Sequence, residues 1–346
     1  MKSTVFIKPN VVAVEDIAKP TIEAADDVII KVVRTCVCGS DLWAYRGLED
    51  KAEHSQNSGH EAIGIVEEVG SDITTVVPGD FVIAPFTHGC GHCAACLAGF
   101  DGDCQEHQNN FSAGVQAQYI RFQHGEWALV KVPGQPSDYS EEMLKSLLSL
   151  ADVMATGYHA ARVANVTTGD TVVVVGDGAV GLCGVIAAKM RGAKRIIIMS
   201  RHEDRQRLAT EFGATDIIAT RGAEAEAQVR ELTNGAGADA VLECVGTELS
   251  NETAMNIARP GAIVGRVGLP HEPKMDMTAS FYNNTIIAGG PASVTTYDKQ
   301  VLLKAVLDGD IHPGKVFTET FKLDDINAAY QAMTNREAIK TLITVD

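Results

Sequence analysis

The pattern of apolar residues changes along the chain, and its first third is typical of short strands. Runs rich in β-branched residues occupy positions 27–35, 62–69 and 80–85, and Gly, Pro and Asp separate them. These runs predict strands, and the turns between them indicate an irregular, mostly β region.

From about residue 168 the pattern alternates between continuous apolar runs and helical spacing. Helical spacing over 180–191 and 203–212 separates the first of these runs. The runs themselves predict strands over residues 171–175, 195–199, 216–218, 240–245, 262–267 and 285–288. Apolar strands with helices between them are typical of a parallel sheet that is covered on both faces.

The last part of the chain resembles the first third in character. After about residue 293 the pattern predicts a helix over 299–307, a Gly/Pro turn and a last strand over 339–345. We therefore predict an α/β protein of two domains. A doubly wound parallel-sheet domain, residues 156–293, is inserted into a mostly β domain made of residues 1–155 and 294–346.

Length and charge narrow the class of protein. The 346 residues suffice for about two domains, and 29 Lys and Arg against 45 Asp and Glu give a net charge of −16. Such a surface repels phosphate backbones and anionic lipids, so we expect neither a nucleic acid nor a membrane as partner. The stretch closest to a membrane span, residues 172–190, contains Asp177 and four glycines, and the start lacks an apolar signal segment. We expect a soluble, cytoplasmic protein.

A glycine-rich motif follows the predicted strand over 171–175. It reads Gly176-Asp177-Gly178-Ala179-Val180-Gly181 and opens the predicted helix, with another strand ending about twenty residues later. The glycines allow a tight turn, and the N–H groups at the start of the helix face a pyrophosphate. The motif predicts a Rossmann-type dinucleotide site; a glycine-rich turn without a ligand is the alternative.

The residues after the second strand of this domain bear on the choice of dinucleotide. An NAD site usually has an acid there, which binds the ribose 2′-hydroxyl, whereas this chain has Ser200 and Arg201. A hydroxyl followed by an arginine suits a 2′-phosphate, which favours a charge-assisted partner. We therefore predict NADP(H) in preference to NAD(H). Arg201 as a solvated residue before a helix is the alternative.

Four of the eight cysteines lie within fifteen residues. Cys90, Cys93, Cys96 and Cys104 stand on a glycine-rich segment of low apolar content. Four thiolates complete a tetrahedron around zinc, so this spacing predicts a structural zinc site that holds the segment folded. Unligated cysteines or a redox pair are the alternatives. The neighbouring His88, His92 and His107 are surplus to four ligands and are expected at the surface.

A second set of metal-binding residue types is spread along the chain. It consists of Cys38 before Gly39-Ser40-Asp41, His60 and Glu61 after Gly59, and Asp152. Sequence spacing alone does not show that these residues converge. His60 is equally consistent with a core or surface position, and Asp152 with a helix cap.

Taken together, these motifs resemble the zinc-dependent medium-chain alcohol dehydrogenases over essentially the whole chain. The stretch Gly59-His60-Glu61 with Gly64 and Gly70 is similar to the zinc signature of that family, and Cys38-Gly39-Ser40-Asp41 to its first catalytic ligand segment. The four clustered cysteines resemble its structural-zinc lobe. The resemblance implies a GroES-like catalytic domain with an inserted Rossmann domain.

The resemblance also implies roles for individual residues. Cys38, His60 and Asp152 would bind a catalytic zinc, with Glu61 as an occasional ligand or directly behind the ligands. Three protein ligands leave a fourth position for the substrate. Ser40 would bind the substrate oxygen and begin a proton path, although it could instead cap a helix.

Further implied residues concern the cofactor. Thr156 matches a residue that lies against the nicotinamide, and Lys340 matches a basic residue that reaches the cofactor phosphates. Asp152 and the pair Ser200-Arg201 resemble the bacterial NADP-linked secondary-alcohol dehydrogenases. The remaining residues that we expect to bind the cofactor are Val267, Gly268 and Leu269.

One position departs from the family pattern. Many members have a histidine two residues after the aspartate of Ser40-Asp41, as the end of a proton relay, whereas this chain has Trp43. The relay would then use the cofactor ribose, water or a residue such as His54, and Trp43 could wall the substrate pocket.

The sequence therefore predicts a zinc-dependent oxidoreductase with about two zinc ions per chain. It would transfer a hydride between NADP(H) and a small alcohol, ketone or aldehyde, and the resemblance implies a homodimer or homotetramer. A polyol-, threonine- or formaldehyde-type dehydrogenase on the same scaffold is an alternative. A non-catalytic NADPH-binding module is another.

Overall fold

The computed structural model describes residues 1–56, 58–106, 111–270, 277–292 and 296–345. The chain forms two compact units. The first consists of Met1–Asp152 and Ser293–Asp346, and the second of Val153–Ala292. The second unit is therefore inserted into the first.

The first unit is built on a mostly antiparallel sheet in the order β14-β15-β3-β4-β5-β7, with β6 paired to β3. Its strands are β3 (Val28–Val37), β4 (Ala62–Val69), β5 (Phe81–Ala84), β6 (Tyr119–Phe122), β7 (Val130–Val132), β14 (Phe317–Lys322) and β15 (Lys340–Thr344). A separate antiparallel pair is formed by β1 (Lys2–Lys8) and β2 (Val11–Asp16).

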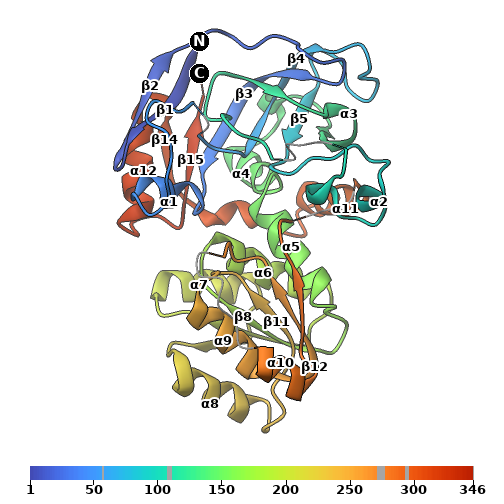
Figure 1. Cartoon of the computed structure of the whole chain (residues 1–346), viewed down its shortest axis with the longest axis vertical. Coiled ribbons are helices and arrows are strands. Elements are labelled where there is room, and N and C mark those ends of the chain that lie inside the picture. The colour runs from blue at the N-terminus through green and yellow to red at the C-terminus, as the bar shows by residue number, and fades with distance from the viewer. Residues whose placement is uncertain (57, 107–110, 271–276, 293–295, 346) are drawn as a thin grey trace. The chain divides into compact units, whose positions relative to one another are not determined.

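The C-terminal segment completes this sheet. In Figure 1 the red β15 lies beside the blue β3, and Leu342 is paired with Cys36. Both strands are buried here, because their β-branched and aliphatic side chains join one core with those of β4 and β5. This pairing places the segment just before residue 40 next to the segment just after residue 339.

Short helices and turns surround this sheet. The α-helices are α1 (Asp41–Tyr45), α2 (Ala94–Leu97), α3 (Gly125–Ala128), α4 (Glu141–Ser149), α11 (Thr296–Leu307) and α12 (Ile326–Thr334). The 3₁₀ turns are η1 (Asp101–Asp103), η2 (Pro136–Asp138), η3 (Pro313–Val316) and η4 (Leu323–Asp325). Helix α4 begins at a serine cap, since the Ser140 side chain accepts a hydrogen bond from the Met143 N–H.

The second unit is a parallel sheet in the order β10-β9-β8-β11-β12-β13. The strands are β8 (Thr171–Val175), β9 (Arg195–Met199), β10 (Asp216–Ile218), β11 (Ala238–Glu243), β12 (Ala258–Arg266) and β13 (Ile286–Gly289). The helices are α5 (Val153–Val163), α6 (Ala179–Met190), α7 (Glu203–Phe212), α8 (Gly222–Leu232), α9 (Glu248–Ile257) and α10 (Met277–Asn283).

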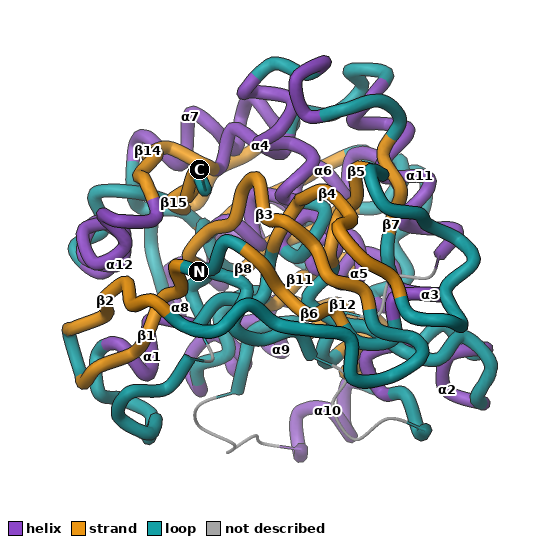
Figure 2. The backbone as a smooth tube through the Cα atoms, turned by 90° about the horizontal axis from the view of Figure 1, so that it is seen from above, coloured by secondary structure: helices purple, strands orange, loops and turns teal. Residues whose placement is uncertain are grey.

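The central strands of this sheet are apolar on both sides because helices cover both faces. Helix α6 packs with α5 and α7, while α9 packs with α8 and α10. Strand β11 lies between β8 and β12 in this sheet, and Figure 2 colours all three as strands. The strand order changes direction between β8 and β11, which is the position where doubly wound sheets bind their ligands.

One predicted strand is shifted in the structure. The apolar run over 240–245 predicted a strand, but β11 spans Ala238–Glu243. The carboxylate of Glu243 accepts hydrogen bonds from the N–H groups of Val245 and Gly246, at 2.9 and 2.8 Å. These bonds turn the chain away from the sheet. Separately, none of the helices in the described residues is long and apolar enough to span a membrane.

Candidate metal and cofactor sites

The first unit brings the dispersed metal-binding residues together. Single donor atoms of Cys38, His60, Glu61 and Asp152 all lie within 4.8 Å of one another. Cys38 directly follows β3, His60 and Glu61 directly precede β4, and Asp152 follows α4. Because β3 and β4 are paired, the end of one strand lies beside the start of the other.

The donor atoms of this cluster lie close to one another. His60 Nε2 lies 3.3 Å from Asp152 Oδ2 and 3.8 Å from Glu61 Oε1, and Cys38 Sγ lies 3.5 Å from Asp152 Oδ2. The side chains of His60 and Asp152 are 17% and 8% exposed. The cluster is thus largely buried, and part of the His60 side chain remains exposed.

Gly59 places His60 in the cluster. Its φ of +76° is left-handed, and a Cβ there would lie 2.5 Å from Gln116 Cγ. Gln116 itself is fixed, because its amide donates to the Cys36 carbonyl and its Oε1 accepts from the Tyr330 hydroxyl. A side chain at position 59 would therefore displace the segment that carries His60.

Carboxylates surround the imidazole. Burial lowers the pKa of His60, but hydrogen bonding to Asp152 and to Asp41 outweighs this and raises it well above 6.5. Asp41 Oδ1 lies 3.6 Å from His60 Nδ1, and Asp41 Oδ2 accepts a hydrogen bond from the Cys38 N–H at 2.9 Å. Asp41 therefore orients two members of the cluster, as carboxylates behind metal ligands do.

The donor set fits a catalytic zinc ion. A thiolate, an imidazole and a carboxylate are ordinary zinc ligands, and three of them leave one position open. Glu61 Oε2 is buried and has no hydrogen-bond partner among the residues that the structure describes. A buried carboxylate oxygen without a hydrogen-bond partner is costly, and a metal ion held by the neighbouring ligands would satisfy it.

Lys340 lies behind Glu61. Its Nζ is 2.7 Å from Glu61 Oε1 and 3.3 Å from the Val37 carbonyl, and the side chain is 1% exposed. The sequence implied that this residue reaches the cofactor phosphates. In the structure its ammonium group is held within the first unit by Glu61, a pairing that no sequence signal indicated.

Ser40 and Trp43 lie at helix α1. Ser40 has the N-cap position, but its side chain makes no capping hydrogen bond in this structure. It is half-buried and directly follows the Cys38-Gly39 segment. The Ser40 hydroxyl therefore does not cap helix α1, which was the alternative role that the sequence left open.

The four clustered cysteines also converge. Cys90 Sγ lies 3.9 Å from Cys96 Sγ, and Cys93 Sγ lies 3.9 Å from Cys104 Sγ. Two thiolates at 2.3 Å from a zinc ion in tetrahedral geometry are about 3.8 Å apart, so these spacings fit a structural site. All four cysteines are free thiols in the structure.

Backbone N–H groups favour the thiolate of Cys93, whereas burial raises the pKa of Cys90 and of Cys96 above the ordinary value of 9.0. Hydrogen bonds from the N–H groups of Cys96 and Gln105 lower the pKa of Cys93 to about 6. Of the nearby histidines, His88 is buried and packs on Phe122, whereas His92 is exposed and paired with Glu106. His107 lies outside the described residues.

The second unit forms the predicted glycine loop between β8 and α6. A Cβ on Gly181 would lie 2.0 Å from the Gly176 carbonyl oxygen, whereas a Cβ on Gly178 would meet nothing within 4 Å. Gly181 therefore allows helix and strand to pack closely, and Gly178 leaves free space above the start of α6. Such space permits the approach of a pyrophosphate.

A polar network links this loop to the end of β9. The Ser200 hydroxyl donates to Asp177 Oδ2 at 2.8 Å, and Arg205 Nη1 lies 3.2 Å from Asp177 Oδ1. Arg201 is exposed. No sequence signal indicated Arg205, because only its position in the first turn of α7 brings it to the loop.

The remaining cofactor candidates lie as follows. Val267 and Gly268 follow β12 and donate their N–H groups to the Glu243 carbonyl, while Leu269 is exposed. A Cβ on Gly268 would lie 2.2 Å from the Gly246 nitrogen, so two turns pass in close contact at the carboxyl ends of β11 and β12. Thr156 is buried on α5.

Comparisons with known proteins identify the family of both units. Residues 24–134 match the model of the alcohol dehydrogenase GroES-like domain, and residues 179–299 match that of the zinc-binding dehydrogenases. The NADP-dependent isopropanol dehydrogenase of Clostridium beijerinckii is 33% identical over 70% of this chain and 68% of its own length.

A further relative and a solved structure also match, over different shares of their lengths. Zinc-type alcohol dehydrogenase B of Aspergillus flavus is 36% identical to this chain. The match covers 78% of this chain and 64% of the length of that relative. The structure of alcohol dehydrogenase TADH from Thermus sp. ATN1 matches with a TM-score of 0.89 at 29% identity, covering 100% of both chains.

The fold, the two clusters and these matches define a class. The chain belongs to the zinc-dependent medium-chain alcohol dehydrogenase family. It is an alcohol dehydrogenase-type oxidoreductase that uses zinc and a nicotinamide cofactor on small molecules.

Proposed function

We propose that the protein transfers a hydride reversibly between NADP(H) and a small alcohol, ketone or aldehyde. The observation that carries this proposal is the convergence of Cys38, His60 and Asp152 on one point in the first unit. Three ligands of this chemistry provide an open-sided metal site, which a purely structural metal does not need. The same convergence argues against a binding module without turnover.

The side chains around the cluster have distinct tasks. Cys38, His60 and Asp152 would hold a zinc ion, which when bound acidifies a hydroxyl or polarises a carbonyl. Asp41 orients the imidazole through Nδ1, and the Lys340–Glu61 pair fixes the carboxylate behind the ligands. Ser40, whose hydroxyl is not engaged in a helix cap, takes the substrate proton and starts its path to solvent.

The second unit supplies the cofactor site. We propose that residues 176–181 cradle the pyrophosphate and that Arg201 attracts the 2′-phosphate of NADP(H). Thr156, Val267, Gly268 and Leu269 are proposed to bind the nicotinamide half. The NADP-dependent isopropanol dehydrogenase among the relatives supports the choice of cofactor.

An absorbance assay at the NADPH band tests the function. Purified protein is mixed with NADPH and a panel of small ketones and aldehydes, and with NADP⁺ and the corresponding alcohols. We expect turnover that is lost with a chelator and restored by zinc. Binding of NADPH without turnover on any member of the panel would contradict the proposal.

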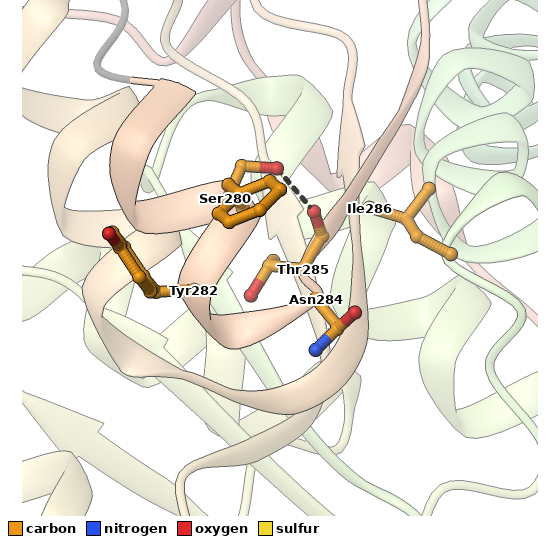
Figure 3. A pocket seen from close by; sticks show the side chains of 6 residues that line it. Ser280, Tyr282, Asn284, Thr285 and Ile286 are labelled. Atoms are coloured by element: carbon orange, nitrogen blue, oxygen red, sulfur yellow. Dashed lines mark hydrogen bonds between the residues drawn. The ribbon is translucent and has the colours of Figure 1, made fainter.

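We further propose that the protein is a homodimer or homotetramer that associates through the edge of the second unit. Strand β13 ends the parallel sheet, and Ile286 on it is 53% exposed. Beside it a shallow pocket is lined by Ser280, Phe281, Tyr282, Asn284, Thr285 and Ile286 (Figure 3). Phe281 and Tyr282 are more than three-quarters exposed, at 78% and 76%. Light scattering on the purified protein tests this, and a monomer would contradict it.

A further inference from the structure

The end of β9, where doubly wound folds distinguish NAD(H) from NADP(H), lies beside a carboxylate that belongs to another segment, the loop after β8. In doubly wound folds the adenosine ribose is bound at the end of the second strand, which is β9 here. The residue at that end is Ser200, and its hydroxyl donates to Asp177 Oδ2 at 2.8 Å. Asp177 belongs to the glycine loop after β8.

This carboxylate is held from a second side. Arg205 Nη1 lies 3.2 Å from Asp177 Oδ1 and 3.3 Å from the Asp177 carbonyl oxygen. The side chain of Asp177 is 18% exposed, and that of Arg205 is 14% exposed. The carboxylate is therefore fixed in place while part of its surface still faces solvent.

The network changes what Ser200 can do. A serine hydroxyl has one proton, and Ser200 donates it to Asp177. Ser200 is buried, and while that bond exists it has no hydroxyl proton to donate to a phosphate. The free lone pairs of the carboxylate can instead accept a hydrogen bond from a ribose 2′-hydroxyl.

The charges near this position oppose each other. Arg205 balances the charge of Asp177, and the exposed Arg201 adds one positive charge. Arg201 attracts a 2′-phosphate, while Asp177 weakens its binding and stabilises a 2′-hydroxyl.

We propose that Asp177 is a specificity-determining residue that binds the 2′-hydroxyl of NAD(H) and limits the preference for NADP(H). The inference rests on the proposed dinucleotide function and deepens it. It assigns to the second residue of the glycine loop the task that an acid at the end of β9 performs in other NAD sites.

Direct binding measurements test the assignment independently of turnover. The dissociation constants of NADPH and NADH are measured by fluorescence titration for the wild type, Asp177→Asn and Asp177→Ser. Asp216→Asn is the matched control: it also removes an arginine-paired carboxylate from the second unit, but at the amino end of β10. Thermal melts verify that each variant is folded.

We expect Asp177→Asn to shift the preference toward NADPH by about tenfold, because one charge near a phosphate dianion is removed. Asp177→Ser is expected to shift it in the same direction, and Asp216→Asn to leave it unchanged. An unchanged or lowered NADPH preference in both Asp177 variants would overturn the proposal, as would an equal loss of both cofactors.

A different result would identify a failure of the proposed function itself. Wild-type protein that binds neither NADPH nor NADH has no dinucleotide site. Arg201→Ala tests the NADP(H) part alone, since it should weaken NADPH and leave NADH nearly unchanged. That result does not depend on the behaviour of Asp177.

Discussion

At the scale of single residues, the most constrained pair in the first unit is Glu61 with Lys340. Both side chains are 1% exposed, and their charged atoms lie 2.7 Å apart. Burial alone would lower the pKa of Lys340, but the charges of Cys36 and Glu61 raise it well above 10.5. Burial raises the pKa of Glu61, and Lys340 offsets part of that effect. Each charge is therefore tolerated because the other is present.

Removal of one partner tests this dependence. Lys340→Met should lower the free energy of unfolding of the metal-free protein by about 3–5 kcal/mol, because a buried carboxylate loses its counter-charge. Urea denaturation measures the change. The double variant Glu61→Gln/Lys340→Met is the control and should recover much of the loss. A single variant as stable as the wild type would show that Glu61 is already neutral.

At the scale of elements, two glycines of the turn between β8 and α6 differ in the reason for which a glycine is needed. Gly181 is required by the fold, since a Cβ would lie 2.0 Å from a backbone oxygen. Gly178 is not required by the fold, since a Cβ there meets nothing within 4 Å. If the loop binds a pyrophosphate, a glycine at position 178 is required by the ligand and not by the packing of the fold.

The two alanine variants should therefore differ. Gly178→Ala should retain the melting temperature of the wild type but bind NADPH at least about tenfold more weakly, because its methyl group occupies the approach path. Gly181→Ala should lower the melting temperature. Calorimetry and fluorescence titration measure both effects. Wild-type NADPH affinity in Gly178→Ala would place the cofactor elsewhere.

Strands β9 and β10 are also joined by an ion pair whose strength depends on pH. Arg195 Nη2 and Nε lie 2.8 Å from the two carboxylate oxygens of Asp216. The hydrogen bond from Arg195 is the main cause that lowers the pKa of Asp216 below its ordinary value of 3.8. A carboxyl with a lowered pKa stabilises the fold above pH 3.8, and this contribution is lost as the pH falls through the lowered pKa.

Asp216→Asn should consequently lower the free energy of unfolding by up to about 1 kcal/mol at pH 7, since the pair is partly exposed. The difference from the wild type should shrink as the pH is lowered to about 3. Urea titrations across this range measure it. Asp324→Asn removes the partner of the more exposed Lys2 and should change little at any pH. A pH-independent effect of Asp216→Asn would indicate packing rather than charge.

At the scale of the whole molecule, the first unit carries both metal clusters and the second carries the glycine loop. The first unit is assembled from both ends of the sequence, because β15 pairs with β3 and brings Lys340 behind Glu61. The cluster of Cys38, His60, Glu61 and Asp152 therefore depends on a segment that follows the inserted unit.

Sequence patterns predicted the elements that depend on local composition. The continuous apolar runs over 171–175 and 195–199 coincide with β8 and β9, and the run over 62–69 with β4. Helices α4 and α5 were not predicted, because no element was assigned between the run that ends at residue 85 and the strand over 171–175. The helices there are fixed by a serine cap and by packing on distant strands, which local patterns do not reveal.

The same limit applies to the sites. The spacing of Cys90, Cys93, Cys96 and Cys104 is local, so the sequence alone indicated their cluster. Cys38, His60 and Asp152 meet only because β3 pairs with β4 and α4 packs on both strands. The link between Asp177, Ser200 and Arg205 joins three segments of the second unit through side chains, and no motif records it.

The central claim is that three dispersed side chains hold one metal ion separately from the four clustered cysteines. Zinc analysis of the wild type, His60→Ala and Cys96→Ser, each confirmed to be folded, tests it most directly. We predict about two zinc ions per wild-type chain and about one in His60→Ala, with the remaining ion bound by the cysteines. Cys96→Ser should lose the other ion. A His60→Ala variant with the same zinc content as the wild type would contradict the account.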